Sequence, residues 1–217
     1  MRIWQIWATG ILGAVSALAA PVGLQAASIV PGSVLIPAAA EAEPSGGLII
    51  ATAATPFSVP GAFSGTLYSD VISGDAANPL GGLTFVYRVT NDGVSGPNSI
   101  GRLSIDDFFG FLTDASYNPS AGVAPASIDR NVSADVIGFN FLPTPVDPLA
   151  GFLAPGASSA RLIVQTNSPA YKGGLASLID GGVISVATFA PAAVPEPGMG
   201  VLAALSLAGL VAARRRR

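Results

Sequence analysis

The sequence contains no cysteine and no histidine among its 217 residues. Without cysteine there can be no disulfide, so a hydrophobic core has to stabilise the fold unaided. The two absences together exclude a Ser-His-Asp triad, a cysteine nucleophile and the usual zinc ligands. Most hydrolase mechanisms are therefore ruled out, and carboxylate chemistry is what remains.

Charged residues are also scarce, at 11% of the chain, and they are unevenly placed. Five of the ten basic residues lie at the two ends, as Arg2 and four consecutive C-terminal arginines. Between them, five basic side chains face twelve acidic ones once Glu196 is left out, a net charge of about −7. Because nucleic acid needs clustered positive charge, this acidic surface argues against it as a partner.

The N-terminus has a basic start, an apolar run over residues 3–20 and small residues behind it. This order is typical of a secretory signal peptide, which would be handled by the general secretion machinery. The small-x-small pattern favours cleavage after Ala19, and a proline close behind leaves Ala26 and Ala27 as alternatives. We expect residues 1–27 to be this signal. An uncleaved anchor is the alternative, because the run nearly reaches spanning length.

The C-terminus combines three features in order. Pro195, Glu196 and Pro197 form a tripeptide that should be extended, since proline fixes φ and disfavours a helix before it. Residues 198–213 carry no charge, are apolar on every helical face and would form a transmembrane helix of about 24 Å at ~1.5 Å per residue. Snorkelling and local thinning would let this short helix span the bilayer. The positive-inside rule keeps a final basic cluster in the cytoplasm: Arg214, Arg215, Arg216 and Arg217.

This tail resembles the PEP-CTERM sorting signal of Gram-negative bacterial surface proteins, which has the same three parts in the same order. The resemblance implies recognition by an exosortase, a membrane-embedded cysteine protease or transpeptidase that would cut near the tripeptide. It implies a precursor anchored transiently in the inner membrane, then a cell-surface or extracellular-matrix location with exopolysaccharide as a candidate partner. A plain tail anchor is the alternative. A lipid-anchor signal fits less well, because it lacks an arginine stop.

The composition favours short strands and turns, because the chain has 26 glycines and 18 prolines. Between the two ends, no segment has a convincing amphipathic helical pattern. In the clearest strand, 83–90, Leu83, Phe85, Tyr87 and Val89 should be buried, whereas Thr84, Arg88 and Thr90 should point outward. The other predicted strands are 62–71, 100–105, 108–112, 128–132, 135–141, 159–166 and 182–189.

Seven or eight strands with Pro/Gly loops between them, such as Gly173-Gly174, predict an all-β fold. We expect a single β-sandwich over residues 62–191. Residues 28–61 should be a partly ordered lead-in with possible edge strands at 34–36 and 48–50. Residues 192–217 should hold a linker and the sorting segment. The segments around 82–103 and 179–191 also resemble the central domains of other proteins with this tail. That resemblance implies no chemistry.

No catalytic residue and no cofactor are expected. Asp106 and Asp107 would point to opposite faces of a strand, so they could not flank one bond. Ca²⁺ is a weaker alternative, since turn geometry also accounts for its candidate ligands and no calcium-loop spacing appears. Those candidates are Asp70, Asp75, Asn78, Asn91, Asp92, Asp106, Asp107 and Asp114. Lys172 should lie in an exposed loop, and a sugar could stack on Tyr68, Tyr117 or Tyr171.

These observations predict a non-enzymatic exported protein with a structural or adhesive role in an exopolysaccharide or biofilm setting. The first alternative, from another class, is a carbohydrate- or calcium-dependent binding module. A carboxylate-dependent secreted hydrolase fits less well and would need two carboxyl groups facing one cleft.

Overall fold

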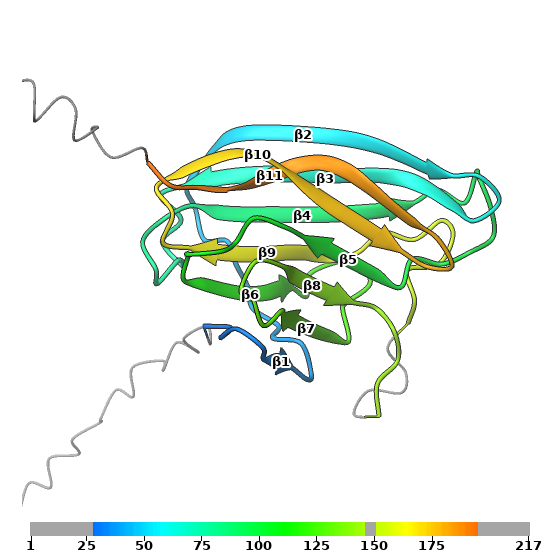
Figure 1. The fold of residues 1–217 in the computed structure, drawn as a ribbon, viewed down its shortest axis with the longest axis horizontal. Coiled ribbons are helices and arrows are strands. Elements are labelled where there is room, and N and C mark those ends of the chain that lie inside the picture. Colours follow the sequence, from blue (N-terminus) through cyan, green and yellow to red (C-terminus); the bar gives the residue numbers. More distant parts are fainter. Residues whose placement is uncertain (1–27, 146–150, 195–217) are drawn as a thin grey trace, which may run out of the picture.

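Two antiparallel sheets face each other in the computed structural model, which describes residues 28–145 and 151–194 (Figure 1). The six-stranded sheet consists, in spatial order, of β1 (Val34–Leu35), β7 (Ser127–Arg130), β8 (Ile137–Asn140), β5 (Arg102–Ile105), β10 (Ala170–Ile179) and β11 (Val183–Ala192). The five-stranded sheet consists of β2 (Leu48–Val59), β3 (Phe63–Ser73), β4 (Thr84–Asn91), β9 (Arg161–Thr166) and β6 (Thr113–Asn118). The all-β sandwich expected from the sequence is therefore confirmed.

The core lies between the sheets and contains the inward positions of both. Phe85, Tyr87 and Val89 of β4 have no exposed surface, as their alternation predicts. The Tyr87 hydroxyl reaches across the core and donates a hydrogen bond of 2.8 Å to the carbonyl oxygen of Phe189 in β11. Thr55 of β2 likewise bonds to Ala187 of β11, so the two sheets are joined along this side.

The described residues form eleven strands, more than the seven or eight predicted. Two of the additional strands come from the lead-in, where β1 and β2 each occupy a sheet edge and begin at the positions of the possible edge strands expected at 34–36 and 48–50. The twelve-residue β2 pairs with β3 along its whole length, so the sandwich begins well before the boundary expected at residue 62.

The prediction of a loop at Gly173-Gly174 is wrong, because both residues lie inside β10. There Gly174 pairs with Thr188 of β11, and an added Cβ would come within 2.6 Å of the Cβ of Ala190. Glycine here permits a close approach of neighbouring strands, and the sequence gives the same signal for a turn.

The strand predicted at 108–112 is also wrong. Asp107 and Gly110 have φ values of 76° and 84°, which interrupt an extended backbone. Phe108 is nevertheless buried and packs edge-to-face on Phe85, with ring centroids 6.2 Å apart. The apolar run therefore forms a loop that fills the core, and β6 begins after it.

Candidate functional site

The sorting segment and the signal-cleavage region lie outside the described residues; their members are Ala19, Ala26, Ala27, Pro195, Glu196, Pro197, Arg214, Arg215, Arg216 and Arg217. The structure does place the two points at which these segments join the sandwich. The first and last described residues lie at the same end of the sandwich, at the left in Figure 1. Among the described residues, no helix has the length and apolar character needed to cross a membrane.

Side-chain hydrogen bonds fix both ends. Ser28 Oγ donates to the carbonyl of Thr113 at 3.2 Å, where β6 begins. Thr113 pairs with Thr166 at the end of β9. Ser168, just beyond, donates its hydroxyl to the carbonyl of Ala192 at 2.8 Å. A chain of contacts therefore connects the first described residue with the end of β11 across this end of the sandwich.

A hollow of about 460 Å³ opens on the outer face of the five-stranded sheet, and we call it the outer groove. Its lining residues are Thr52, Tyr68, Asp70, Val86, Tyr87, Arg88, Ser120, Ala121, Gly122, Ser158, Ser159 and Arg161. The guanidinium carbon of Arg88 lies 4.6 Å from the centroid of the Tyr68 ring. Asp70 accepts a hydrogen bond of 2.7 Å from the Thr52 hydroxyl.

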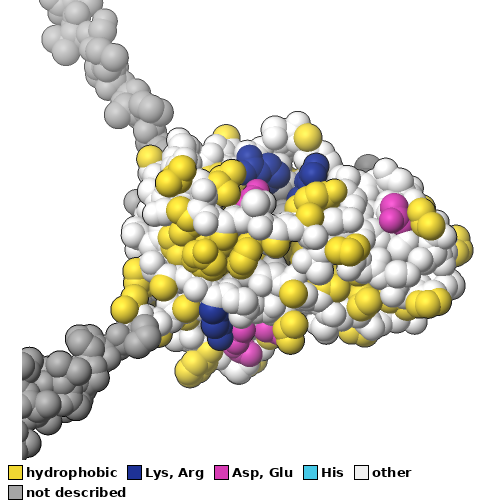
Figure 2. Space-filling model, turned by 90° about the horizontal axis from the view of Figure 1, so that it is seen from above, with side chains coloured by type: hydrophobic (Ala, Val, Ile, Leu, Met, Phe, Trp, Pro, Cys, Tyr) yellow, Lys and Arg dark blue, Asp and Glu magenta, His cyan; other side chains and the backbone are white. Residues whose placement is uncertain are grey.

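The body's five basic residues divide into two kinds. Arg102 and Lys172 pair with carboxylates, and Arg130 donates to backbone carbonyls that include those of Ile29 and Phe108. Within residues 28–145 and 151–194, the side chains of Arg88 and Arg161 make neither a hydrogen bond nor an ion pair, and both residues line the outer groove. The charged side chains visible in Figure 2 form a few small groups on a mainly uncharged surface.

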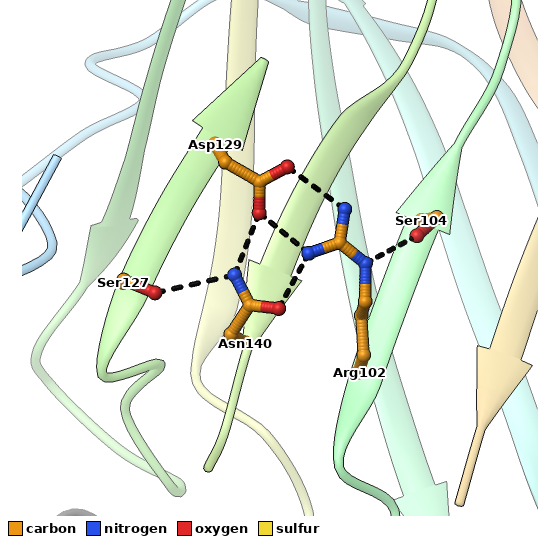
Figure 3. A network of polar contacts seen from close by, with 5 residues as sticks. All are labelled: Arg102, Ser104, Ser127, Asp129 and Asn140. Carbon is orange, nitrogen blue, oxygen red and sulfur yellow. Dashed lines mark hydrogen bonds and ion pairs between the residues drawn. The ribbon is translucent and has the colours of Figure 1, made fainter. Parts of the chain in front are cut away.

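Figure 3 shows how Arg102 is used. Its guanidinium makes a bidentate contact with the Asp129 carboxylate, with nitrogen–oxygen distances of 2.5 and 2.8 Å, and also donates a hydrogen bond to Oδ1 of Asn140. Burial alone would raise the pKa of Asp129, but the hydrogen bonds from Arg102 and Asn140 and the charge of Arg102 hold it below its ordinary value. These residues come from β5, β7 and β8, so the network ties three strands together.

Four acidic residues meet at the outer face of the five-stranded sheet, and we call them the acid cluster: Glu41, Glu43, Asp75 and Asp114. Glu43 accepts hydrogen bonds from Ser116 at 2.5 Å and Gln165 at 2.6 Å. Asp75 accepts one from Thr84 at 2.7 Å. Thr84, predicted to face solvent, has no exposed surface because these groups cover it.

Asp114 is the residue of the cluster that lacks polar partners. Its side chain is 2% exposed, and neither carboxyl oxygen has a hydrogen-bond partner among the described residues. Burial, and then the charge of Glu43, raise its pKa to about 6, although the amide of Ala115 partly offsets this. Burial, Glu43 and Asp114 similarly raise the pKa of Glu41 to about 7. The cluster can therefore hold protons near neutral pH, but its buried carboxyls are closed to a substrate.

A second hollow, of about 400 Å³, is lined by Asp107 and Asp135 together with Lys172. The Lys172 ammonium lies 3.2 Å from the Asp107 carboxylate, so one of the two acids already has a cationic partner. Lys172 lies in β10, so the prediction that it sits in a loop is wrong. Tyr171 beside it is 38% exposed and packs edge-to-face on Phe189.

Three further calcium candidates make hydrogen bonds that stabilise the local backbone structure. Asn78 and Asn91 are buried and donate to backbone carbonyls. Asp92 accepts from Ser64 and from the amide of Val94. Within the described part of the chain, no group of three or more acidic side chains is arranged to hold a metal ion.

Comparison with known proteins locates one similarity. Residues 193–217 match the model of the PEP-CTERM protein-sorting motif, which confirms the resemblance seen in the tail. No curated protein and no solved structure matches the chain. The motif implies a protein that is exported, associated with the membrane or cell surface, and processed by an exosortase.

Proposed function

We propose that the protein is a non-enzymatic structural or adhesive component of the cell surface or exopolysaccharide matrix, delivered there after exosortase processing at Pro195-Glu196-Pro197. The observation that supports it most directly is the sorting motif, which begins at residue 193. Neither a bound cofactor nor catalysis by the body is part of this proposal. The body's contribution is a folded β-sandwich that remains after the tail has been cut.

The short distance between the body and the motif favours a body that stays at the membrane until the tail is cut and is delivered afterwards. Strand β11 ends at Ala192, and Pro195 is three residues further on. Three extended residues span at most about 10 Å at ~3.3–3.6 Å each. The folded body would therefore sit directly above the membrane until the cut is made, and only a short linker would remain on the mature protein.

Cell fractionation tests the destination. The variant replaces Pro195, Glu196 and Pro197 by alanine, and it should accumulate in the inner-membrane fraction while the unmodified protein reaches the surface or matrix fraction. Pro143→Ala with Pro145→Ala is the matched control, since Pro143-Thr144-Pro145 is a second Pro-x-Pro tripeptide within the body. Equal delivery of the triple variant to the matrix would contradict the proposal.

A carbohydrate-binding module is the second candidate function, and the outer groove favours it. Its tyrosine, hydroxyl and charged side chains could contact a sugar, and about 460 Å³ is within the ~300–1,000 Å³ typical of small-molecule sites. Binding to the producing cell's own polysaccharide, measured with and without a chelator, separates calcium-dependent from calcium-independent recognition. Failure to retain the protein on that polymer under both conditions would count against this candidate.

A carboxylate-dependent hydrolase has weaker support. It would use the hollow between Asp107 and Asp135, where Lys172 already pairs with one acid. Release of reducing sugar from that polysaccharide, abolished by Asp135→Asn, is the result that would establish it.

A further inference from the structure

We propose that the outer groove binds a carboxylate-bearing saccharide of the uronic-acid type, with Arg88 and Arg161 as the residues that contact its carboxylates. This inference rests on the carbohydrate-binding function suggested above and specifies its ligand. It is independent of the processing of the tail, which involves residues at the other end of the sequence.

Strand register brings the two arginines together. Tyr68 of β3 is directly opposite Arg88 of β4. Tyr87, one residue earlier, is opposite Leu162 of β9, so Arg161 is adjacent to Arg88 on the neighbouring strand. Arg161 is in turn opposite Asn118 of β6. The four side chains form one row across the outer face, although they are far apart in the sequence.

Hydrogen bonds and ion pairs within the fold do not account for this arrangement. Like charges on neighbouring strands repel each other and destabilise a sheet. The body has a large excess of acidic residues, yet neither arginine pairs with an acid among the described residues. The other three cations are all engaged within the fold. Two unpaired arginines on one hollow of an acidic protein therefore indicate a site for a negatively charged ligand.

Two guanidinium groups in one hollow suit an oxyanion such as a carboxylate. Guanidinium groups bind carboxylates through two parallel hydrogen bonds, which an ammonium group cannot reproduce. The contact of the Arg88 guanidinium with the Tyr68 ring, at 4.6 Å, restrains this side chain and reduces its freedom before a ligand arrives.

Asp70 restricts the class of ligand further. Its carboxylate lines the same hollow and would repel a simple anion such as phosphate or an acidic peptide. An acidic sugar, however, has hydroxyl groups that can donate hydrogen bonds to Asp70. Its carboxylate can accept hydrogen bonds from the arginines. Thr52, Ser120 and Ser158 add hydroxyl groups to the lining. A ligand with both hydroxyls and carboxylates would offer partners to Asp70 and to the two arginines.

Isothermal titration calorimetry with oligogalacturonate tests the proposal on the full chain. All samples carry glutamine in place of Arg214 through Arg217, because that basic cluster would bind any polyanion by itself. The variants are Arg88→Gln and Arg161→Gln, and Lys172→Gln is the control that removes the same charge on another sheet. Neutral maltoheptaose and poly-L-glutamate serve as the comparison ligands.

We expect saturable binding of oligogalacturonate that each arginine variant weakens about tenfold, while the Lys172 variant stays within about twofold. Asp70→Asn should let polyglutamate bind more tightly, because it removes the charge that repels a simple anion. Maltoheptaose and polyglutamate should bind at least about tenfold less tightly. The proposal is overturned if oligogalacturonate does not bind, if polyglutamate binds equally well, or if all three glutamine variants lose the same affinity. Equal binding of maltoheptaose would overturn the acidic-sugar assignment while leaving a carbohydrate module in place.

Discussion

Asp114 is the position at which a small chemical change should alter the stability of the protein most clearly. Its buried carboxyl has no side-chain hydrogen-bond donor beside it, and it lies opposite Gln165, whose Oε1 also lacks a partner among the described residues. Replacing it with asparagine keeps the shape of the side chain and removes the ionisable group. The new amide can also donate to the free oxygen of Gln165.

The magnitude follows from the pKa. Burial and the charge of Glu43 raise the pKa of Asp114 from 3.8 to about 6. One pH unit of pKa difference corresponds to about 1.4 kcal/mol, so ionising this group costs the folded state up to about 3 kcal/mol. The folded protein holds the proton more tightly than the unfolded chain does. The stability that protonated Asp114 contributes is therefore fully present below about pH 4 and is lost as the pH rises through about 6.

We therefore expect Asp114→Asn to be more stable than the unmodified protein at pH 8, by up to about 3 kcal/mol, and closely similar to it at pH 4. Urea unfolding followed by circular dichroism at both pH values measures this. Asp180→Asn, in the turn between β10 and β11, is the matched control and should change stability by less than about 0.5 kcal/mol. A variant that is no more stable than the unmodified protein at pH 8 would refute the reasoning.

Two further substitutions test the sandwich. Gly138→Ala should destabilise the protein by about 1–3 kcal/mol in urea unfolding, because an added Cβ would lie 2.0 Å from Nη2 of Arg102 and displace it from its carboxylate on β7. An unchanged unfolding midpoint would show that the arginine network is dispensable. Tyr87→Phe should cost about 1 kcal/mol, because it removes the hydrogen bond to the Phe189 carbonyl that joins the sheets. Tyr117→Phe is its control, and an equal loss in both would contradict the role assigned to this bond.

The parts of the fold that sequence predicts are those governed by local alternation. The buried face of β4 is an example, since the period of two is visible within eight residues. Strand β10 was missed because Gly173 and Gly174 give the same local signal for a turn as for a close strand contact. What distinguishes the two is Ala190 on β11, and sequence alone does not reveal that neighbour.

The outer groove and the acid cluster could not be predicted from the sequence, for the same reason. Arg88 and Arg161 belong to strands that become neighbours only when the sheet forms. The acid cluster likewise draws Glu43, Asp75 and Asp114 from three distant segments. The sorting motif differs, because it is contiguous and works without reference to the fold. It was therefore recognisable from residues 195–217 alone, and the family match confirms it.

The most direct test of the account is the mass of the mature protein. Intact-mass analysis with peptide mapping of the C-terminus should be made on the protein from the surface and matrix fraction of cells with an active exosortase, and on the protein from the membrane fraction of cells without it. We expect the chain from cells with the enzyme to end near Pro195-Glu196-Pro197, and the chain from cells without it to retain Arg217. A mature protein that still carries Arg217 when the exosortase is active would contradict the central claim.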